Sequence, residues 1–201
     1  MKKLLHVGCG LSTIKDLPTI FQDGSWQEVR FDIDEEVNPD ILGTLLDMEA
    51  VESGSVDAIY SSHNIEHVYY HEVLLVLKEF KRILTDDGLA IVACPDIGLI
   101  CELALQDGLD APLYQSSSGP ITPLDIIYGH SASIKTGATY MAHKTGFDIK
   151  LLAKRFRQAG FGNLHGKRLK PRKELLFVAS KRRVSDKEII QKFDDFGKGR
   201  A

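Results

Sequence analysis

The sequence has 201 residues, of which 43% are hydrophobic and 26% charged, and its formal net charge is −3 at neutral pH. These values are ordinary for one globular domain with a substantial core. The apolar runs are too short to span a bilayer, and no signal peptide is expected. Three cysteines without CxxC spacing exclude a disulfide framework and predict a reducing, cytoplasmic location.

The charge is distributed unevenly along the chain. Residues 150–201 hold 16 Lys and Arg against 5 Asp and Glu, so the remainder is strongly acidic. A basic segment of this kind is compatible with a nucleic acid, a sugar nucleotide or the acidic part of the same chain as its partner. A solvated basic surface is the simpler interpretation.

Short apolar runs alternate with helical stripes along the chain. This alternation is typical of a parallel sheet with helices on both faces. We therefore predict an α/β fold, with a doubly wound, mostly parallel Rossmann-like sheet and an antiparallel last strand. The first five strands are expected at residues 4–7, 26–31, 40–46, 56–62 and 89–94.

The clearest helix is expected at residues 72–84, where Val73, Leu77, Phe80 and Leu84 form one apolar stripe. Pro18 limits the regularity of an earlier helical segment. That segment is expected at 14–21, further helices at about 100–105, 148–159 and 185–196, and the last two strands at 162–168 and 174–180.

Residues 98–146 break this alternation. They include Gln115-Ser116-Ser117-Ser118-Gly119-Pro120 and further Gly and Ser positions, and the segment is too long for a simple connection. We interpret residues 1–201 as a single domain with a lid or substrate-facing insertion at about 98–146. Tyr140 and Lys144 lie late in this insertion, where they could close over a site.

The glycine turn after the first strand is the most informative motif. The apolar run 4–7 ends in Gly8-Cys9-Gly10, and Asp32 closes the next apolar run, 22 residues after Gly10. Glycine allows the backbone to approach a ligand closely, and an acid at this spacing can accept hydrogen bonds from ribose hydroxyls. The motif predicts a nucleoside site, with Asp34 as the alternative acid.

Further polar residues follow other strands of the predicted sheet. Ser62 and His63 come at the end of strand 56–62, and Asp96 follows strand 89–94. Ligands bind at the carboxyl ends of parallel strands, so Asp96 is a candidate to orient or deprotonate an acceptor. His143 is the candidate general base of the insertion, because an unperturbed histidine pKa of about 6.5 suits neutral pH. Ordinary packing and surface roles remain open for these residues.

Residues 63–67 read His-x-x-Glu-His, the inverted zinc-protease pattern. Zinc would need His63 and His67 on one helical face and a third ligand. Because His63 directly follows an expected strand, a helix would begin after it. We therefore expect no metal. His67 would hold the loop where the helix begins, with a catalytic role as the alternative.

Several segments, in their order along the chain, resemble the motifs of the class I S-adenosylmethionine-dependent methyltransferases. The resemblance covers most of the chain and implies S-adenosylmethionine as cofactor. It also implies an enzyme that transfers a methyl group to a small-molecule or polymer-bound acceptor. The segments are His6-Val7-Gly8-Cys9-Gly10, Phe31-Asp32-Ile33-Asp34, Leu46-Asp47-Met48, 56–60 with 65–68, 80–88, and Ala159-Gly160-Phe161.

The resemblance implies roles for individual residues. The turn Gly8-Cys9-Gly10 would bring its backbone against the amino acid end and sulfonium of the cofactor. Asp47 and Met48 would face the adenine, because a carboxylate can accept its exocyclic amine and a methionine packs on a ring face.

Two other functions remain open. An NAD(P)-dependent oxidoreductase would share the turn and the acid, but it favours a third glycine where this chain has Thr13. A non-catalytic methyltransferase-fold protein could bind a partner through the basic segment. The acceptor could be a small molecule or a saccharide; nucleic acid is allowed, although the segment lacks aromatic residues for base stacking. A homo-oligomer is also open, because another subunit could supply part of the substrate cover.

Overall fold

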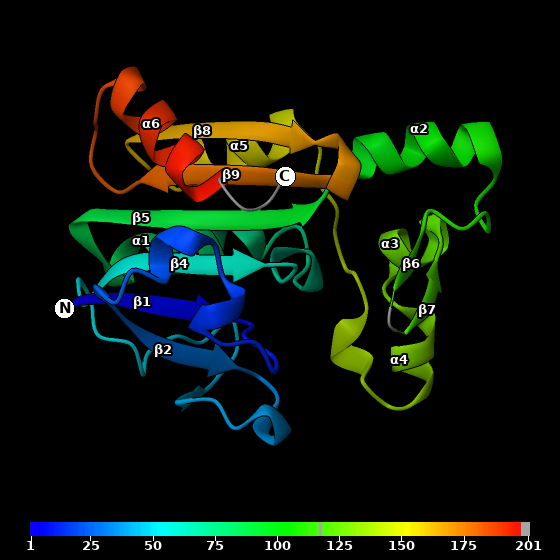
Figure 1. The fold of residues 1–201 in the computed structure, drawn as a ribbon, viewed down its shortest axis with the longest axis horizontal. Helices are drawn as coiled ribbons and strands as arrows, with labels where there is room; N and C mark the ends of the chain where they lie inside the picture. The colour runs from blue at the N-terminus through cyan, green and yellow to red at the C-terminus, as the bar shows by residue number, and fades with distance from the viewer. Residues whose placement is uncertain (117, 198–201) are drawn as a thin grey trace.

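The computed structural model describes residues 1–116 and 118–197, and within them one sheet of seven strands forms the centre of the fold. Its order is β3-β2-β1-β4-β5-β9-β8, and β9 runs antiparallel between β5 and β8 while the other pairs are parallel (Figure 1). The predicted doubly wound sheet with an antiparallel last strand is therefore confirmed. The strands are Lys2–Val7 (β1), Trp26–Asp32 (β2), Ile41–Leu42 (β3), Val56–Ser62 (β4), Leu84–Pro95 (β5), Asn163–Leu169 (β8) and Glu174–Ser180 (β9).

Helices cover both faces of the sheet, as predicted. On one face α1 (Val73–Ile83) and α5 (Ile149–Gln158) enclose a core that includes the fully buried Phe80 and Phe156. On the other face α6 (Asp186–Gly197) packs with two 3-10 turns. Burial of these apolar side chains stabilises both layers.

Several predicted elements differ from the structure. The fifth strand, expected at 89–94, begins at Leu84, directly after α1. The helical segment expected at 14–21 consists of two 3-10 turns, η1 (Ile14–Asp16) and η2 (Thr19–Phe21), because Pro18 between them has no N–H to donate. The third strand, expected at 40–46, ends at Leu42, where the chain leaves the edge of the sheet. The residues after it are therefore free to form a wall beside the sheet.

Residues 97–141 form a group of short elements beyond the arrowheads of β1, β4 and β5 (Figure 1). The group overlaps the predicted insertion at about 98–146, and Ser117, which belongs to that prediction, lies outside the described residues. The elements are α2 (Ile97–Asp107), β6 (Tyr114–Ser116), β7 (Gly119–Ile121), α3 (Pro123–Tyr128), α4 (Ser131–Lys135) and η5 (Thr139–Met141).

Within residues 1–116 and 118–197, no helix combines the length and the apolar composition that a bilayer crossing requires.

Candidate active site

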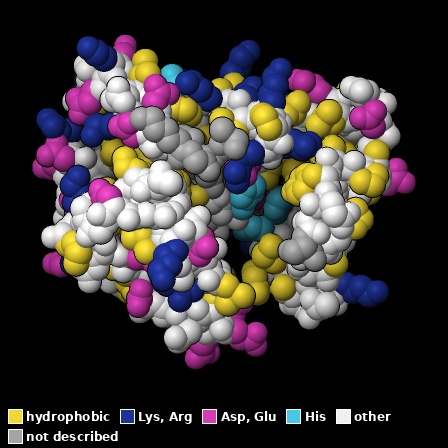
Figure 2. Space-filling model, in the orientation of Figure 1, with side chains coloured by type: hydrophobic (Ala, Val, Ile, Leu, Met, Phe, Trp, Pro, Cys, Tyr) yellow, Lys and Arg dark blue, Asp and Glu magenta, His cyan; other side chains and the backbone are white. Residues whose placement is uncertain are grey.

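A cavity of about 460 Å³ opens at the carboxyl ends of β1, β2 and β4. Its volume lies within the range of small-molecule sites. Figure 2 shows histidine side chains gathered in the hollow between the sheet and the segment beside it. The cavity brings together Gly8, Gly10, Asp32, Ser62 and His63, five of the predicted cofactor-site residues.

The glycine turn places bare backbone on the cavity wall. Gly8 and Gly10 have φ values of +62° and +51°, which residues with a Cβ rarely adopt. A Cβ on Gly8 would lie 1.8 Å from Oδ1 of Asn64, whose Nδ2 donates to the Val7 carbonyl at 2.8 Å. A Cβ on Gly10 would meet no atom within 4 Å. Gly8 is therefore required by packing, whereas Gly10 keeps space free beside the cavity.

Asp32 connects the end of β2 to this turn. Its Oδ2 accepts from the Gly10 N–H at 2.7 Å, and its Oδ1 accepts from the Asp34 N–H at 3.0 Å. Asp32 lines the cavity although only 8% of its surface is exposed. Each carboxylate oxygen keeps a further lone pair, so the side chain can also accept hydrogen bonds from a ligand.

Arg30 stabilises the glycine turn and the loop after β2, a role that was not predicted from the sequence. Its guanidinium donates to the carbonyl oxygens of Gly10, Val37 and Asn38. Arg30 precedes Asp32 by two positions and therefore shares its face of β2. The position of an arginine two residues before the predicted acid could have indicated this role in the sequence.

His63 is a cation on the cavity wall. It follows β4 with φ +57°, and its Nε2 lies 3.0 Å from Oε1 of Glu174. Burial alone would lower the pKa of His63, but the hydrogen bond to Glu174 and the negative charge of the nearby Glu66 outweigh it and raise the pKa to about 9. The imidazole is therefore protonated at neutral pH and suits an anionic group rather than acting as a base.

The structure does not bring Asp47, Met48 or the Cys9 thiol to the cavity. Asp47 is exposed on a turn after the short β3, and Met48 is fully buried in the core below α1. Neither side chain is placed to face an adenine. Cys9 is also buried, which raises the pKa of its thiol to about 11, so only its backbone is available at the turn.

Asp96, a predicted catalytic residue, caps a helix and forms an ion pair. It is fully buried at the start of α2, where Oδ1 accepts from the Leu99 N–H at 3.2 Å. Its carboxylate also pairs with the guanidinium of Arg168. Asp96 does not line the cavity, so it is not placed to deprotonate an acceptor there.

His143, the predicted general base, also lies off the cavity. Its Nδ1 donates to the Ile126 carbonyl at 2.7 Å, and burial lowers its pKa. Other residues of the same segment reach the cavity wall, namely Tyr140, Met141 and Lys144. The Tyr140 hydroxyl donates to Oδ2 of Asp34 at 2.9 Å, which joins this segment to the end of β2.

The sheet order, the antiparallel β9 and the glycine turn paired with an acid define a class I methyltransferase fold. Residues 5–92 match the family model described as a methyltransferase domain. The match covers less than half of the chain and identifies residues 5–92 as similar to a methyltransferase domain. No curated protein sequence matches the chain.

Solved structures agree on the fold. One is the citrinin polyketide synthase CMeT domain, with 14% identity and a TM-score of 0.60, covering 91% of this chain and 47% of that one. Another is the 1,6-didemethyltoxoflavin-N1-methyltransferase of Burkholderia thailandensis with S-adenosylhomocysteine, with 13% identity and a TM-score of 0.55, covering 90% and 71%. A third is an S-adenosylmethionine-dependent methyltransferase of Mesorhizobium loti, with 13% identity and a TM-score of 0.58, covering 89% and 90%.

The chain spans about half the length of the citrinin synthase domain. The matches give no support to an NAD(P)-dependent oxidoreductase.

Proposed function

We propose that the protein transfers a methyl group from S-adenosylmethionine to a small-molecule or polymer-bound acceptor in the cavity described above. The observation that supports this most directly is the hydrogen bond between Gly10 and Asp32 on the cavity wall. It places exposed backbone and a carboxylate side by side, as a nucleoside with a charged side chain requires.

The cofactor fits the residues that line the cavity. In our proposal the backbone of Gly8, Cys9 and Gly10 contacts the amino acid end and the sulfonium. Asp32 accepts hydrogen bonds from the ribose hydroxyls. The apolar wall formed by Ile33, Leu45 and Leu46 takes the adenine in place of Asp47 and Met48.

We assign the remaining wall of the cavity to the acceptor. Ser62 and His63 border both ligands, and the protonated His63 favours a negative charge on the cofactor carboxylate or on the acceptor. The segment with Tyr140 and Lys144 covers the opposite side, so we interpret residues 98–146 as a lid within one domain.

When bound, S-adenosylmethionine supplies a methyl group activated by its sulfonium. The residues of this chain need only align the acceptor with that carbon and exclude water. A fixed general base is required only if the acceptor is protonated near neutral pH. Neither Asp96 nor His143 lines the cavity, which fits a mechanism based on alignment.

The remaining functional predictions concern the acceptor, the assembly and the location of the protein. A small molecule or a saccharide is the proposed acceptor, and one of the structural neighbours is named for a small-molecule methyltransferase. Nucleic acid binding, a homo-oligomer and a cytoplasmic location stay predictions, the last from three free cysteines.

Binding of S-adenosylhomocysteine to two glycine variants tests the proposal. Gly10 and Gly54 both have positive φ, +51° and +66°, and a Cβ on either meets no atom within 4 Å. Only Gly10 lines the cavity. Gly10→Leu should weaken binding at least tenfold in calorimetry, whereas Gly54→Leu should leave the affinity unchanged at a similar loss of thermal stability. Equal affinities for the two variants, or no binding by the unmodified protein, would overturn the proposal.

A further inference from the structure

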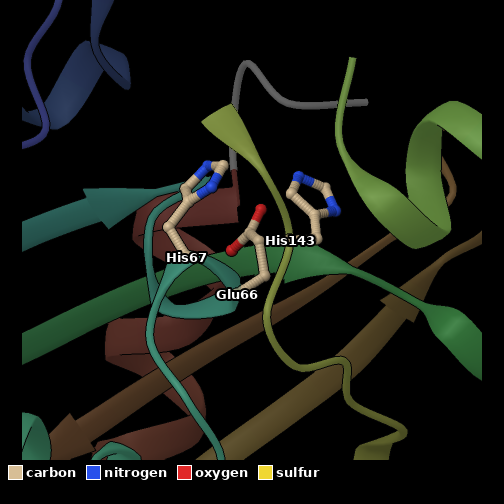
Figure 3. A group of neighbouring side chains, drawn as sticks. All are labelled: Glu66, His67 and His143. Atoms are coloured by element: carbon tan, nitrogen blue, oxygen red, sulfur yellow. The ribbon is translucent and has the colours of Figure 1, made fainter. Parts of the chain in front are cut away.

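Three polar side chains that the proposed function does not use meet at the edge of the cavity. Glu66 and His67 belong to η4 (Ile65–His67), the 3-10 turn after β4, and His143 comes from the segment after η5. One ligand atom from each lies within 4.8 Å of the others. In Figure 3 the two imidazole rings stand on either side of the Glu66 carboxylate.

Backbone hydrogen bonds fix this arrangement. The N–H groups of Lys144 and Thr145 donate to the Glu66 carbonyl at 2.8 and 3.1 Å. The segment that carries His143 is thereby held against η4. The two histidine rings contact each other edge to face, with centroids 4.8 Å apart. The cluster thus joins two segments that are distant in the sequence.

The Glu66 carboxylate makes an ion pair with His63 but no hydrogen bond with the residues that the structure describes. The residue is only 1% exposed, and neither oxygen has a hydrogen-bond partner among the residues that the structure describes. Nδ1 of His63 lies 3.5 Å from Oε1, without hydrogen-bond geometry. Leaving a buried carboxylate in this state is costly, so a further positive group is expected at its oxygens.

The histidines do not supply a proton in the orientation that they adopt. Nδ1 of His67 lies 3.1 Å from the Ala142 carbonyl, and Nδ1 of His143 lies 2.7 Å from the Ile126 carbonyl. A carbonyl oxygen only accepts, so both Nδ1 atoms carry a proton, and in the neutral imidazoles each Nε2 presents a lone pair. Backbone carbonyls orient metal-ligating histidines in the same way. Two imidazoles and a carboxylate therefore lie together, and among the described residues no hydrogen bond reaches either carboxylate oxygen.

We propose that Glu66, His67 and His143 bind a divalent transition-metal ion. Imidazole nitrogens with one carboxylate suit ions such as Zn²⁺ rather than Mg²⁺ or Ca²⁺. Three protein ligands leave a coordination position open for water or another oxygen. Metal–ligand bonds of about 2.1 Å require the three side chains to close together by roughly 1 Å. This is a rotamer adjustment rather than a change of fold.

This proposal revises our expectation of no metal in the His-x-x-Glu-His pattern. We had treated His63 and His67 as a helical pair of ligands. In the structure, however, Nε2 of His63 lies 3.0 Å from Oε1 of Glu174. The pattern instead contributes Glu66 and His67. The third ligand, His143, comes from the insertion, where the sequence spacing could not indicate it.

The site would also give the proposed methyl transfer a way to activate an acceptor, a consequence that rests on the proposed function. His67 lines the cavity, so an ion on its Nε2 would lie in the cavity wall. An acceptor hydroxyl bound to the ion would lose its proton to solvent more readily. Its oxygen lone pair would then attack the methyl carbon, while the carbon–sulfur bond breaks and its electron pair stays on sulfur.

Metal titration tests the site without relying on activity. Untagged protein freed of metal by chelation would be titrated with Zn²⁺ in a calorimeter and with Co²⁺ by visible absorption. We expect one equivalent to bind. Glu66→Gln, which keeps the side-chain shape, and His143→Ala should each weaken binding at least tenfold. His71→Ala is the matched control, because His71 is exposed and lies outside the cluster; its affinity should not change.

The same preparations would be titrated with S-adenosylhomocysteine, which separates this proposal from the proposed function. Intact nucleoside binding in the metal-site variants shows that they are folded, and His143→Ala replaces Glu66→Gln if the latter does not fold. Binding of less than one equivalent of Zn²⁺ by the unmodified protein would overturn the proposed metal site. So would variants that bind Zn²⁺ as tightly as the unmodified protein does.

Discussion

The backbone N–H of Gly10 donates a 2.7 Å hydrogen bond to Oδ2 of Asp32, across 22 positions of sequence. The bond joins the turn after β1 to the end of β2. Asp34 donates to the second carboxylate oxygen, at 3.0 Å. One acid therefore shapes the turn and faces the cavity, so its two roles should be lost together.

Asp32→Asn should weaken S-adenosylhomocysteine binding at least tenfold and lower the free energy of unfolding. The amide can present an oxygen to only one of the two N–H donors, and its nitrogen would face the other. A mispaired buried group costs about 1–3 kcal/mol. Calorimetry and urea unfolding would measure the two effects. Asp47→Asn is the control, because Asp47 is exposed and off the cavity; a comparable loss of binding there would restore our original adenine assignment.

The sheet and the Gly10–Asp32 pair could be predicted because their signals are local in the sequence. Apolar periodicity indicates a strand or a helix, and a glycine turn followed by a spaced acid indicates a nucleoside site. Side-chain partners from distant segments have no such signal. The Asp96 carboxylate pairs with the guanidinium of Arg168 in β8, and Nδ1 of His143 donates to the Ile126 carbonyl. Position in the sequence suggested Asp96 and His143 as bases, but it could not show that both side chains contact other parts of the chain.

Tyr140→Phe should loosen the segment that covers the cavity. The substitution removes the 2.9 Å hydrogen bond to Asp34 and keeps the ring. Because Tyr140 is 42% exposed, the free energy of unfolding should fall by about 1 kcal/mol or less. Amide hydrogen exchange should become faster over residues 139–144. Tyr128→Phe provides the comparison, since Tyr128 is 66% exposed and lies outside the cavity wall; identical exchange in both variants would argue against a tethered lid.

The three cysteines should differ sharply in their reactivity. Burial raises the pKa of Cys9 to about 11 and holds that of Cys94 well above its usual value, whereas Cys101 is exposed on α2. The thiolate is the reactive form. Iodoacetamide at about pH 8 should therefore add one group to the native protein and three groups in denaturant, as read by intact mass. Cys101→Ser should abolish the native reaction; rapid labelling of Cys9 would show that the glycine turn opens.

Stability should fall at acid pH through the capping box of α3. Burial alone would raise the pKa of Asp125, but hydrogen bonds from Ser131 and Thr122 outweigh it and lower the pKa to about 2. A folded-state pKa below the unfolded value gives stability that is present above about pH 4 and lost as the pH falls toward 2. With screening by solvent the contribution is about 1 kcal/mol. Urea unfolding of the unmodified protein and of Asp125→Asn should differ by that amount at pH 6. The difference should shrink as the carboxyl protonates, and a difference that stays constant down to pH 2.5 would contradict the assignment to Asp125.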